Sequence, residues 1–205
     1  MPEEDDSYRQ LQDLGMPIIA IDRTMDPERF CSVISDDCEA SLQLTRSLLQ
    51  PIPRQIALIG ARPELSVSQA RAAGFKKALE DFEGDILIEH GSAFSRECGR
   101  RIIDELLERL GHLPDALVTT SYVLLQGMFD ALLEHPEHKP PLRLATFGDT
   151  QLLDFLPLPV NAMGQQHQMI AEKALDLALA AIEEQRYEPG IHAIARVFKQ
   201  RIHQA

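Results

Sequence analysis

The sequence predicts an α/β protein with parallel sheets, arranged as two three-layer lobes with a cleft between them. Short apolar runs rich in Ile, Leu and Val alternate with segments of helical periodicity, which is the pattern of βαβ units. The runs are continuously apolar, as in strands that are buried on both faces. A chain of 205 residues with 44% hydrophobic content can bury a core of this size.

Five apolar runs are the predicted strands, and they cover residues 17–22, 55–60, 85–89, 115–120 and 142–148. Two further stretches are rich in proline and polar residues, which is typical of connecting segments. We expect QPIPRQ, residues 50–55, to link the two lobes. We expect LEHPEHKPPLR, residues 133–143, to form a surface loop.

The segments between these strands have apolar residues at helical spacing, and they predict helices over 36–49, 66–82, 97–111, 121–133 and 165–185. Ser66 and Gln69 have the S-x-x-Q spacing of a capping box. Gly111 follows the third helix and can close it in a left-handed conformation.

The charge balance excludes some classes of function for this chain. It has 20 basic and 32 acidic side chains, which give a net charge of −12. The phosphate backbone of a nucleic acid repels such a chain, so the charge argues against nucleic-acid binding. The acidic N-terminal sequence MPEEDDSY is unlike a secretory signal, so we expect a cytoplasmic protein. Three cysteines without a CxxC pair predict reduced structural thiols.

No motif of a nucleophile, a phosphate-binding loop or a dinucleotide site is present, and we predict no catalytic residue and no cofactor. His135 and His138 are spaced H-x-x-H, but Pro136 lies between them and makes helical ligand spacing doubtful. We therefore expect a solvated loop there and predict no metal site.

Polar and aromatic side chains follow the carboxyl ends of the predicted strands, where open α/β sheets bind ligands. They are Asp22 and Arg23, Arg71 early in the helix after 55–60, Phe94, Ser121 and Tyr122, Asp149, and Gln165 after a later segment. Carboxylates accept hydrogen bonds from sugar hydroxyls, arginines bind anions, and an aromatic ring can pack on a sugar face. Together they predict a site for a polyol that carries an anionic group.

Each of these residues also has a simpler interpretation. Arg71 could form an ordinary surface ion pair, and the two aspartates could merely end strands. Phe94 could belong to the core, and Tyr122 could fill an interface. The coincidence of all of them at one predicted edge favours the binding site.

The segments PIIAIDR, SQARAAGF, DALVTTSYVLLQG and VNAMGQQH, in this order, resemble LacI-type transcriptional regulators. The segments GARPELSVSQARAAGF and TTSYVLLQGMFD resemble those of the fructose repressor branch, also called the catabolite repressor/activator. The resemblance implies a fold like that of periplasmic sugar-binding proteins, with lobes joined by three crossovers. It places the first lobe at 1–52 plus about 166–190 and the second at 53–165 plus about 191–205.

The resemblance also implies an effector pocket formed by Asp22, Arg23, Arg71, Asp149 and Gln165, with Phe94 against the sugar. The effector of this branch is a phosphorylated fructose, principally fructose 1-phosphate. Where this chain has Ser121 and Tyr122, the family commonly has Asn-Asp; the pair departs from the family pattern but fits the fructose branch. The resemblance implies a homodimer with contacts on the helices at 66–82 and 121–133, although these residues could be core.

The resemblance further implies that the helix-turn-helix DNA-binding domain is absent from this chain and that its first lobe is incomplete. Operator DNA would then be bound only through the missing N-terminal domain. Two other functions stay open from the sequence: a sugar-phosphate enzyme with Asp149 or His167 as its base, and a solute-binding protein of a transporter.

Overall fold

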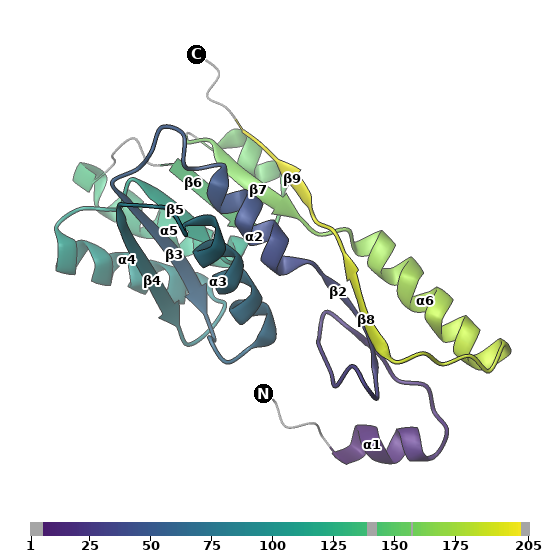
Figure 1. The fold of residues 1–205 in the computed structure, drawn as a ribbon. Helices are drawn as coiled ribbons and strands as arrows, with labels where there is room; N and C mark the ends of the chain where they lie inside the picture. The colour runs from purple at the N-terminus through teal and green to yellow at the C-terminus, as the bar shows by residue number, and fades with distance from the viewer. Residues whose placement is uncertain (1–5, 139–142, 157, 202–205) are drawn as a thin grey trace. The chain divides into compact units, whose positions relative to one another are not determined.

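The computed structural model describes residues 6–138, 143–156 and 158–201 (Figure 1). The chain forms two compact units. The first unit is Met1–Asp36 with Gln165–Arg196, and the second unit is Asp37–Gly164 with Val197–Ala205. The chain therefore passes from one unit to the other three times. The units differ from the predicted lobes at residues 37–52, which belong to the second unit, and at residues 191–196, which belong to the first.

The second unit contains a six-stranded sheet in the order β4-β3-β5-β6-β7-β9. Its strands are β3 (Gln55–Ala61), β4 (Asp85–Gly91), β5 (Ala116–Thr119), β6 (Arg143–Phe147), β7 (Val160–Gly164) and β9 (Val197–Lys199). All neighbours are parallel except β9, which pairs antiparallel with β7. Four of these strands coincide closely with predicted runs.

Helices cover both faces of this sheet, α2 (Asp37–Arg46) and α3 (Ser66–Ala78) on one and α4 (Arg96–Leu110) and α5 (Tyr122–Glu134) on the other (Figure 1). Successive residues of β3 point to opposite faces. Ile56 and Leu58 pack in the cluster beneath α2 and α3, whereas Ala57 and Ile59 pack beneath α4 and α5. Burial on both faces explains the continuous apolar run and confirms the three-layer prediction for this unit.

Close contact between α2 and α3 explains why residues 37–52 join the second unit. A Cβ on Gly74 would lie 2.0 Å from the Cys38 carbonyl oxygen, so only glycine permits this approach. The short helices η1 (Pro136–His138) and η2 (Gln151–Phe155) complete the unit. Part of the predicted loop at 133–143, residues 139–142, lies outside the described residues.

The first unit contains a parallel three-stranded sheet in the order β1-β2-β8. Its strands are β1 (Ile19–Ile21), β2 (Cys31–Ser35) and β8 (Gly190–Ile194), and its helices are α1 (Asp6–Asp13) and α6 (His167–Glu183). Val33 of β2 packs against Ile170 and Ala174 of α6. On the other face, the Ser32 hydroxyl accepts a hydrogen bond from the Met25 backbone N–H at 3.1 Å.

The helix ends confirm one prediction and correct another. Gly111 has φ 71° and closes α4, as predicted. The capping box of Ser66 and Gln69 is wrong, because Leu65 is the N-cap of α3 and makes no side-chain cap bond. Among the described helices, none combines the length and apolar character needed to span a bilayer.

Candidate binding site at the strand ends

The predicted binding residues of the second unit follow the carboxyl ends of its central strands. Strands β3, β5 and β6 are neighbours and run parallel, so their carboxyl ends share one edge of the sheet. Arg71 lies on α3, which follows β3. Ser121 and Tyr122 follow β5, and Asp149 follows β6. Folds of this class bind ligands at this edge.

The Arg71 side chain is held firmly within its own unit. Its Nε donates to Asp37 Oδ1 at 3.0 Å, and its Nη1 donates to the Thr120 carbonyl oxygen at 2.6 Å. Its guanidinium carbon lies 4.2 Å from the centroid of the Phe147 ring, within cation–π range. The interpretation as an exposed surface ion pair does not hold, because both paired side chains are only 11% exposed.

Asp37 is a site residue that the sequence did not single out. It opens α2, and its carboxylate fixes the orientation of the Arg71 guanidinium. The two residues are 34 positions apart, so spacing along the chain could not have paired them. A guanidinium with a fixed orientation loses little rotamer freedom when it binds an anion.

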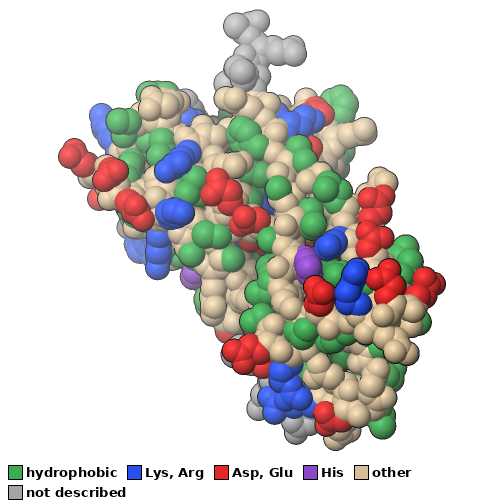
Figure 2. All heavy atoms as spheres, turned by 45° about the vertical axis from the view of Figure 1, so that its right-hand side comes forward, with side chains coloured by type: hydrophobic (Ala, Val, Ile, Leu, Met, Phe, Trp, Pro, Cys, Tyr) green, Lys and Arg blue, Asp and Glu red, His purple; other side chains and the backbone are tan. Residues whose placement is uncertain are grey.

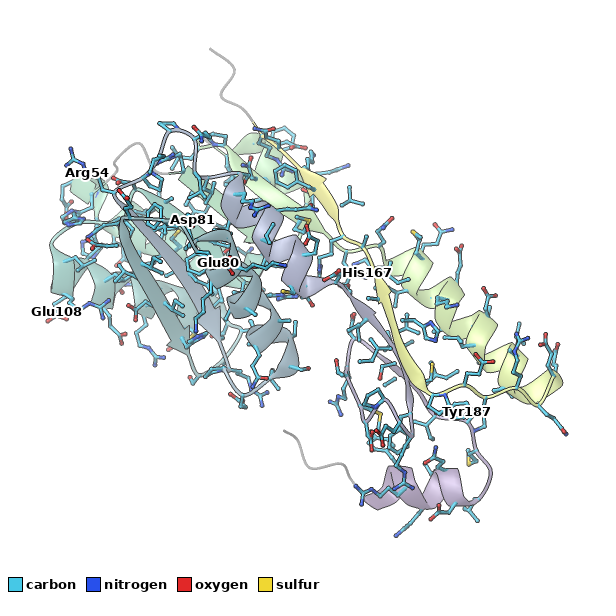
Figure 3. The ribbon with its side chains drawn as sticks, in the orientation of Figure 1. Arg54, Glu80, Asp81, Glu108, His167 and Tyr187 are labelled. Atoms are coloured by element: carbon cyan, nitrogen blue, oxygen red, sulfur yellow. The ribbon has the colours of Figure 1, made fainter. Side chains whose placement is uncertain are left out.

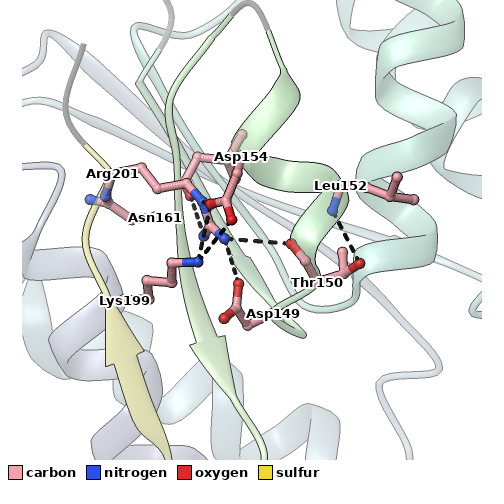
Figure 4. Close-up of polar contacts among 8 residues, drawn as sticks. Asp149, Thr150, Leu152, Asp154, Asn161, Lys199 and Arg201 are labelled. Carbon is pink, nitrogen blue, oxygen red and sulfur yellow. Dashed lines mark hydrogen bonds and ion pairs between the residues drawn. The ribbon is translucent and has the colours of Figure 1, made fainter. Parts of the chain in front are cut away.

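Asp149 is also held by a residue that the sequence did not single out (Figure 4). Arg201 Nη2 donates to Asp149 Oδ1 at 2.6 Å, and Arg201 Nε donates to Asp154 Oδ1 at 2.8 Å. Lys199 Nζ donates to both oxygens of Asp154 at 3.1 Å. Hydrogen bonds from Lys199 and Arg201 lower the pKa of Asp154. Burial opposes the charge of Arg201, but its bonds to the two aspartates raise its pKa on balance.

Ser121 and Tyr122 have local structural partners. The Ser121 hydroxyl accepts a hydrogen bond from the Val123 backbone N–H at 3.3 Å and so caps α5. The Tyr122 side chain lies close to Gly148, where an added Cβ would be 3.2 Å from Tyr122 Cβ. Gly148 has φ 94°, a conformation that favours glycine. The segment from Phe147 to Asp149 therefore meets both Arg71 and Tyr122.

Phe94 and Tyr122 are half-buried and pack against the core cluster beneath α4 and α5. These contacts agree with the simpler interpretation that the sequence left open for Phe94. Stacking of Phe94 on a sugar ring stays a prediction.

A second group of predicted residues lies in the first unit. Gln165 Nε2 donates to both carboxylate oxygens of Asp22, at 2.7 and 2.8 Å. Asp22 has φ 55° at the end of β1, and its backbone N–H donates to the Val33 carbonyl oxygen at 3.0 Å. Arg23 is exposed. The structure thus pairs Asp22 with Gln165, 143 positions apart in the sequence.

The described residues include no group of three or more His, Cys, Asp or Glu side chains that could hold a metal ion. The rings of His135 and His138 lie 6.3 Å apart, and both side chains are near Glu137. Burial raises the pKa of the Cys31 thiol, although Lys173 opposes the shift, so the thiol is not activated. His167, a candidate base of the enzyme alternative, begins α6 and is exposed (Figure 3).

Comparison with known families gives a match over two thirds of the chain. The family described as periplasmic binding proteins and sugar binding domain of LacI family matches residues 2–139. The fructose operon regulatory protein of Vibrio cholerae is 46% identical over 201 residues, which cover 98% of this chain and 61% of the relative. The catabolite repressor/activator of Escherichia coli K12 is 37% identical over 198 residues, 96% of this chain and 59% of the relative.

The chain thus spans about three fifths of the length of these relatives. A solved structure gives a stronger match. The Cra transcriptional dual regulator from Pseudomonas putida, in complex with fructose 1-phosphate, is 67% identical and superposes with a TM-score of 0.93. The match covers 99% of this chain and 75% of that one.

Proposed function

Because this chain belongs to the family of periplasmic binding proteins and the sugar-binding domain of LacI-type regulators, we propose that it binds the effector of a transcription regulator. We propose fructose 1-phosphate as that effector. The observation that carries the proposal is the 67% identity, over 99% of the chain, to a regulator that was crystallised with this ligand. A regulator of an operon acts on DNA, so the proposal includes a cytoplasmic location.

The chemistry of the two residue groups fits a phosphorylated sugar. Arg71 supplies a fixed guanidinium for the phosphate dianion, and Arg23 supplies a second, exposed one. Asp149, Asp22 and Gln165 offer oxygens and an amide to the sugar hydroxyls. Phe94, Ser121 and Tyr122 complete the proposed set.

The effector would act by a shift of population. A ligand changes an equilibrium between two conformations only through its different affinity for them. The conformation that binds fructose 1-phosphate would have the lower operator affinity. A net charge of −12 argues against DNA binding by the residues of this chain, so we propose that operator DNA is bound through a helix-turn-helix domain of the regulator.

An apolar surface on the second unit supports a homodimer. Leu133 at the end of α5 is 72% exposed, and Leu152 and Phe155 of η2 are 60% and 83% exposed. Leu133 also lines a groove of about 240 Å³, together with Tyr122, Leu125, Phe129 and Leu156 among others. Exposed apolar surface of this kind marks a protein interface.

In the other predicted contact helix, α3, Phe75 is buried in the core, and contacts through the exposed residues of this helix stay a prediction. Sedimentation of the wild type and a Phe155→Asp variant tests the interface. A dimer that dissociates in the variant supports the interface, and an unchanged dimer contradicts it.

Calorimetry of the purified chain tests the effector. We expect fructose 1-phosphate to bind more tightly than free fructose, with fructose 1,6-bisphosphate as a third ligand. Arg71→Ala should weaken binding of the phosphorylated sugars by about a hundredfold, because a charged hydrogen-bond partner is lost. Arg62→Ala, on an exposed ion pair with Glu64, is the matched control. Equal affinity in Arg71→Ala and the control would contradict the role of Arg71.

The same titration decides between the proposal and its alternatives. A sensor binds the sugar phosphate without consuming it, whereas an enzyme would turn it over, and the relatives named above are regulators. Recovery of chemically altered ligand after incubation would favour the enzyme.

A further inference from the structure

We propose that Arg201 is a positioning residue of the binding site, which fixes the Asp149 carboxylate and compensates its charge. The inference rests on the proposed function, because it concerns how Asp149 is made ready for an anionic sugar ligand. The predicted site did not include Arg201, which lies on the chain just after β9.

Arg201 has a buried side chain that is held by several hydrogen bonds, unlike an ordinary surface arginine. Its side chain is 8% exposed, and it donates to Asp149 Oδ1 and Asp154 Oδ1 at 2.6 and 2.8 Å. Two carbonyl oxygens, of Val160 and Thr150, accept further bonds from it at 3.2 and 3.5 Å. Figure 4 shows the guanidinium between the two aspartates.

This arrangement fixes the orientation of Asp149. One carboxylate oxygen accepts from Arg201, which leaves the other oxygen for a ligand hydroxyl. Asp149 also lies beside Gly164, where an added Cβ would be 3.5 Å from Asp149 Cβ. The Asp149 side chain remains 29% exposed, so a ligand can still reach it.

Charge gives the second part of the argument. A carboxylate close to a phosphate dianion repels it unless a cation compensates the carboxylate. Arg201 pairs directly with Asp149, whereas Lys199 pairs only with Asp154, so the charge of Asp149 is compensated by Arg201. Asp149 can therefore bind a sugar hydroxyl without repelling the phosphate of the same molecule.

Arg201 also anchors its own segment, and the test must separate the two roles. Its backbone N–H donates to Asn161 Oδ1 at 2.9 Å. A purely structural arginine would affect stability, but its loss would not be relieved by removal of the Asp149 charge. Lys199→Met is the matched control. Lys199 lies two residues before Arg201 and carries the same charge, but its side chain pairs with Asp154.

The experiment is calorimetry of fructose 1-phosphate binding to the wild type, Arg201→Met, Lys199→Met and the Arg201→Met/Asp149→Asn double variant, each at low and high salt. We expect Arg201→Met to weaken binding about tenfold, and more strongly at low salt, where repulsion is less screened. Lys199→Met should change affinity by less than about twofold. The double variant should bind more tightly than Arg201→Met, because the uncompensated charge is gone.

The outcomes separate this inference from the function on which it rests. If the wild type binds no fructose 1-phosphate, the proposed function fails, and the inference fails with it. If the wild type binds and Arg201→Met binds equally well, the inference alone is overturned. A double variant weaker than Arg201→Met, with no dependence on salt, would also overturn it and assign Arg201 to structure alone.

Discussion

In the second unit, helices cover both faces of a six-stranded sheet, whereas in the first unit one long helix covers one face of a three-stranded sheet. Central strand β3 is almost completely buried. In the first unit, α6 contributes Ile170 and Ala174 to the core, while Leu175, Leu179 and Ile182 on the same helix are 42–68% exposed. Hydrophobic side chains reach the surface in Figure 2.

The difference has consequences for stability. Hydrophobic stabilisation follows the apolar area removed from water, and the first unit buries little of the apolar surface of α6. A pocket of about 300 Å³ also lies beside α6, lined in part by Ile19, Cys31, Leu177 and Tyr187. We therefore expect the second unit to carry most of the stability of the chain and the first unit to open more readily.

The largest predicted effect compares the same substitution in the two cores. Ile59→Ala on β3 should lower the free energy of unfolding by about 4 kcal/mol. Ile59 is fully buried beneath α4 and α5, and the packed sheet and helices cannot collapse into the cavity. Ile170→Ala on α6 should cost about 2 kcal/mol, the lower end for this substitution, because its surroundings are loosely packed. Hydrogen exchange of peptides from each unit, measured in urea, gives both free energies of opening.

Equal costs at the two positions would contradict the comparison. Ile52→Ala serves as the control, because this side chain is 75% exposed and its loss should cost less than about 0.5 kcal/mol.

The second predicted effect concerns the one aromatic hydroxyl that joins strands of the first unit within the described chain. The Tyr187 hydroxyl donates to the Ile18 carbonyl oxygen at 2.7 Å and accepts from the Cys31 backbone N–H at 3.0 Å (Figure 3). Tyr187→Phe should destabilise the first unit by about 1 kcal/mol, because the Ile18 carbonyl just before β1 and the Cys31 N–H of β2 lose a partner. Hydrogen exchange should accelerate in β1 and β2 and stay unchanged in β3.

Tyr8→Phe makes the same chemical change on α1 and is the control for Tyr187. Faster exchange in β3 as well would mean that the two units open together, and the proposed difference in their stability would then be wrong.

The same contrast explains what the sequence could predict. Continuous apolar runs located β3, β5 and β6 because these strands are buried on both faces. The run at 85–89 also located β4, although this edge strand is only partly buried. The sequence did not predict β2, β7, β8 and β9, whose short segments mix apolar residues with Ser, Asn, His or Lys. They are strands because of the neighbours with which they pair, and no local pattern records those neighbours.

The candidate site has a similar limit. Strand ends indicated Arg71 and Asp149 because topology alone brings parallel carboxyl ends to one edge. Their partners Asp37 and Arg201 lie 34 and 52 positions away, and only the packed structure brings them near. The predicted capping box at Ser66 failed because α3 already begins at Ser66 and Leu65 is its N-cap. The Ser68 hydroxyl donates to the Ala61 carbonyl oxygen of β3 and so ties this end of the helix to the strand.

The smallest predicted effect tests whether the ion pairs at β9 add to the stability of the second unit. Asp154 accepts bonds from Lys199 and Arg201, which lower its pKa in the folded chain. Its contribution is therefore fully present above the ordinary aspartate pKa of about 3.9 and is lost as the pH falls through the lower folded value. Wild-type stability should fall more steeply below about pH 4 than that of Asp154→Asn.

Urea unfolding of both proteins at a series of pH values measures this difference, so that other carboxylates cancel in the comparison. Glu108→Gln, an exposed position on α4, controls for the change in net charge. The effect should be small because Asp154 is 42% exposed and water screens its ion pairs. Parallel curves for the wild type and Asp154→Asn would mean that the second unit owes its stability to its two-sided core alone.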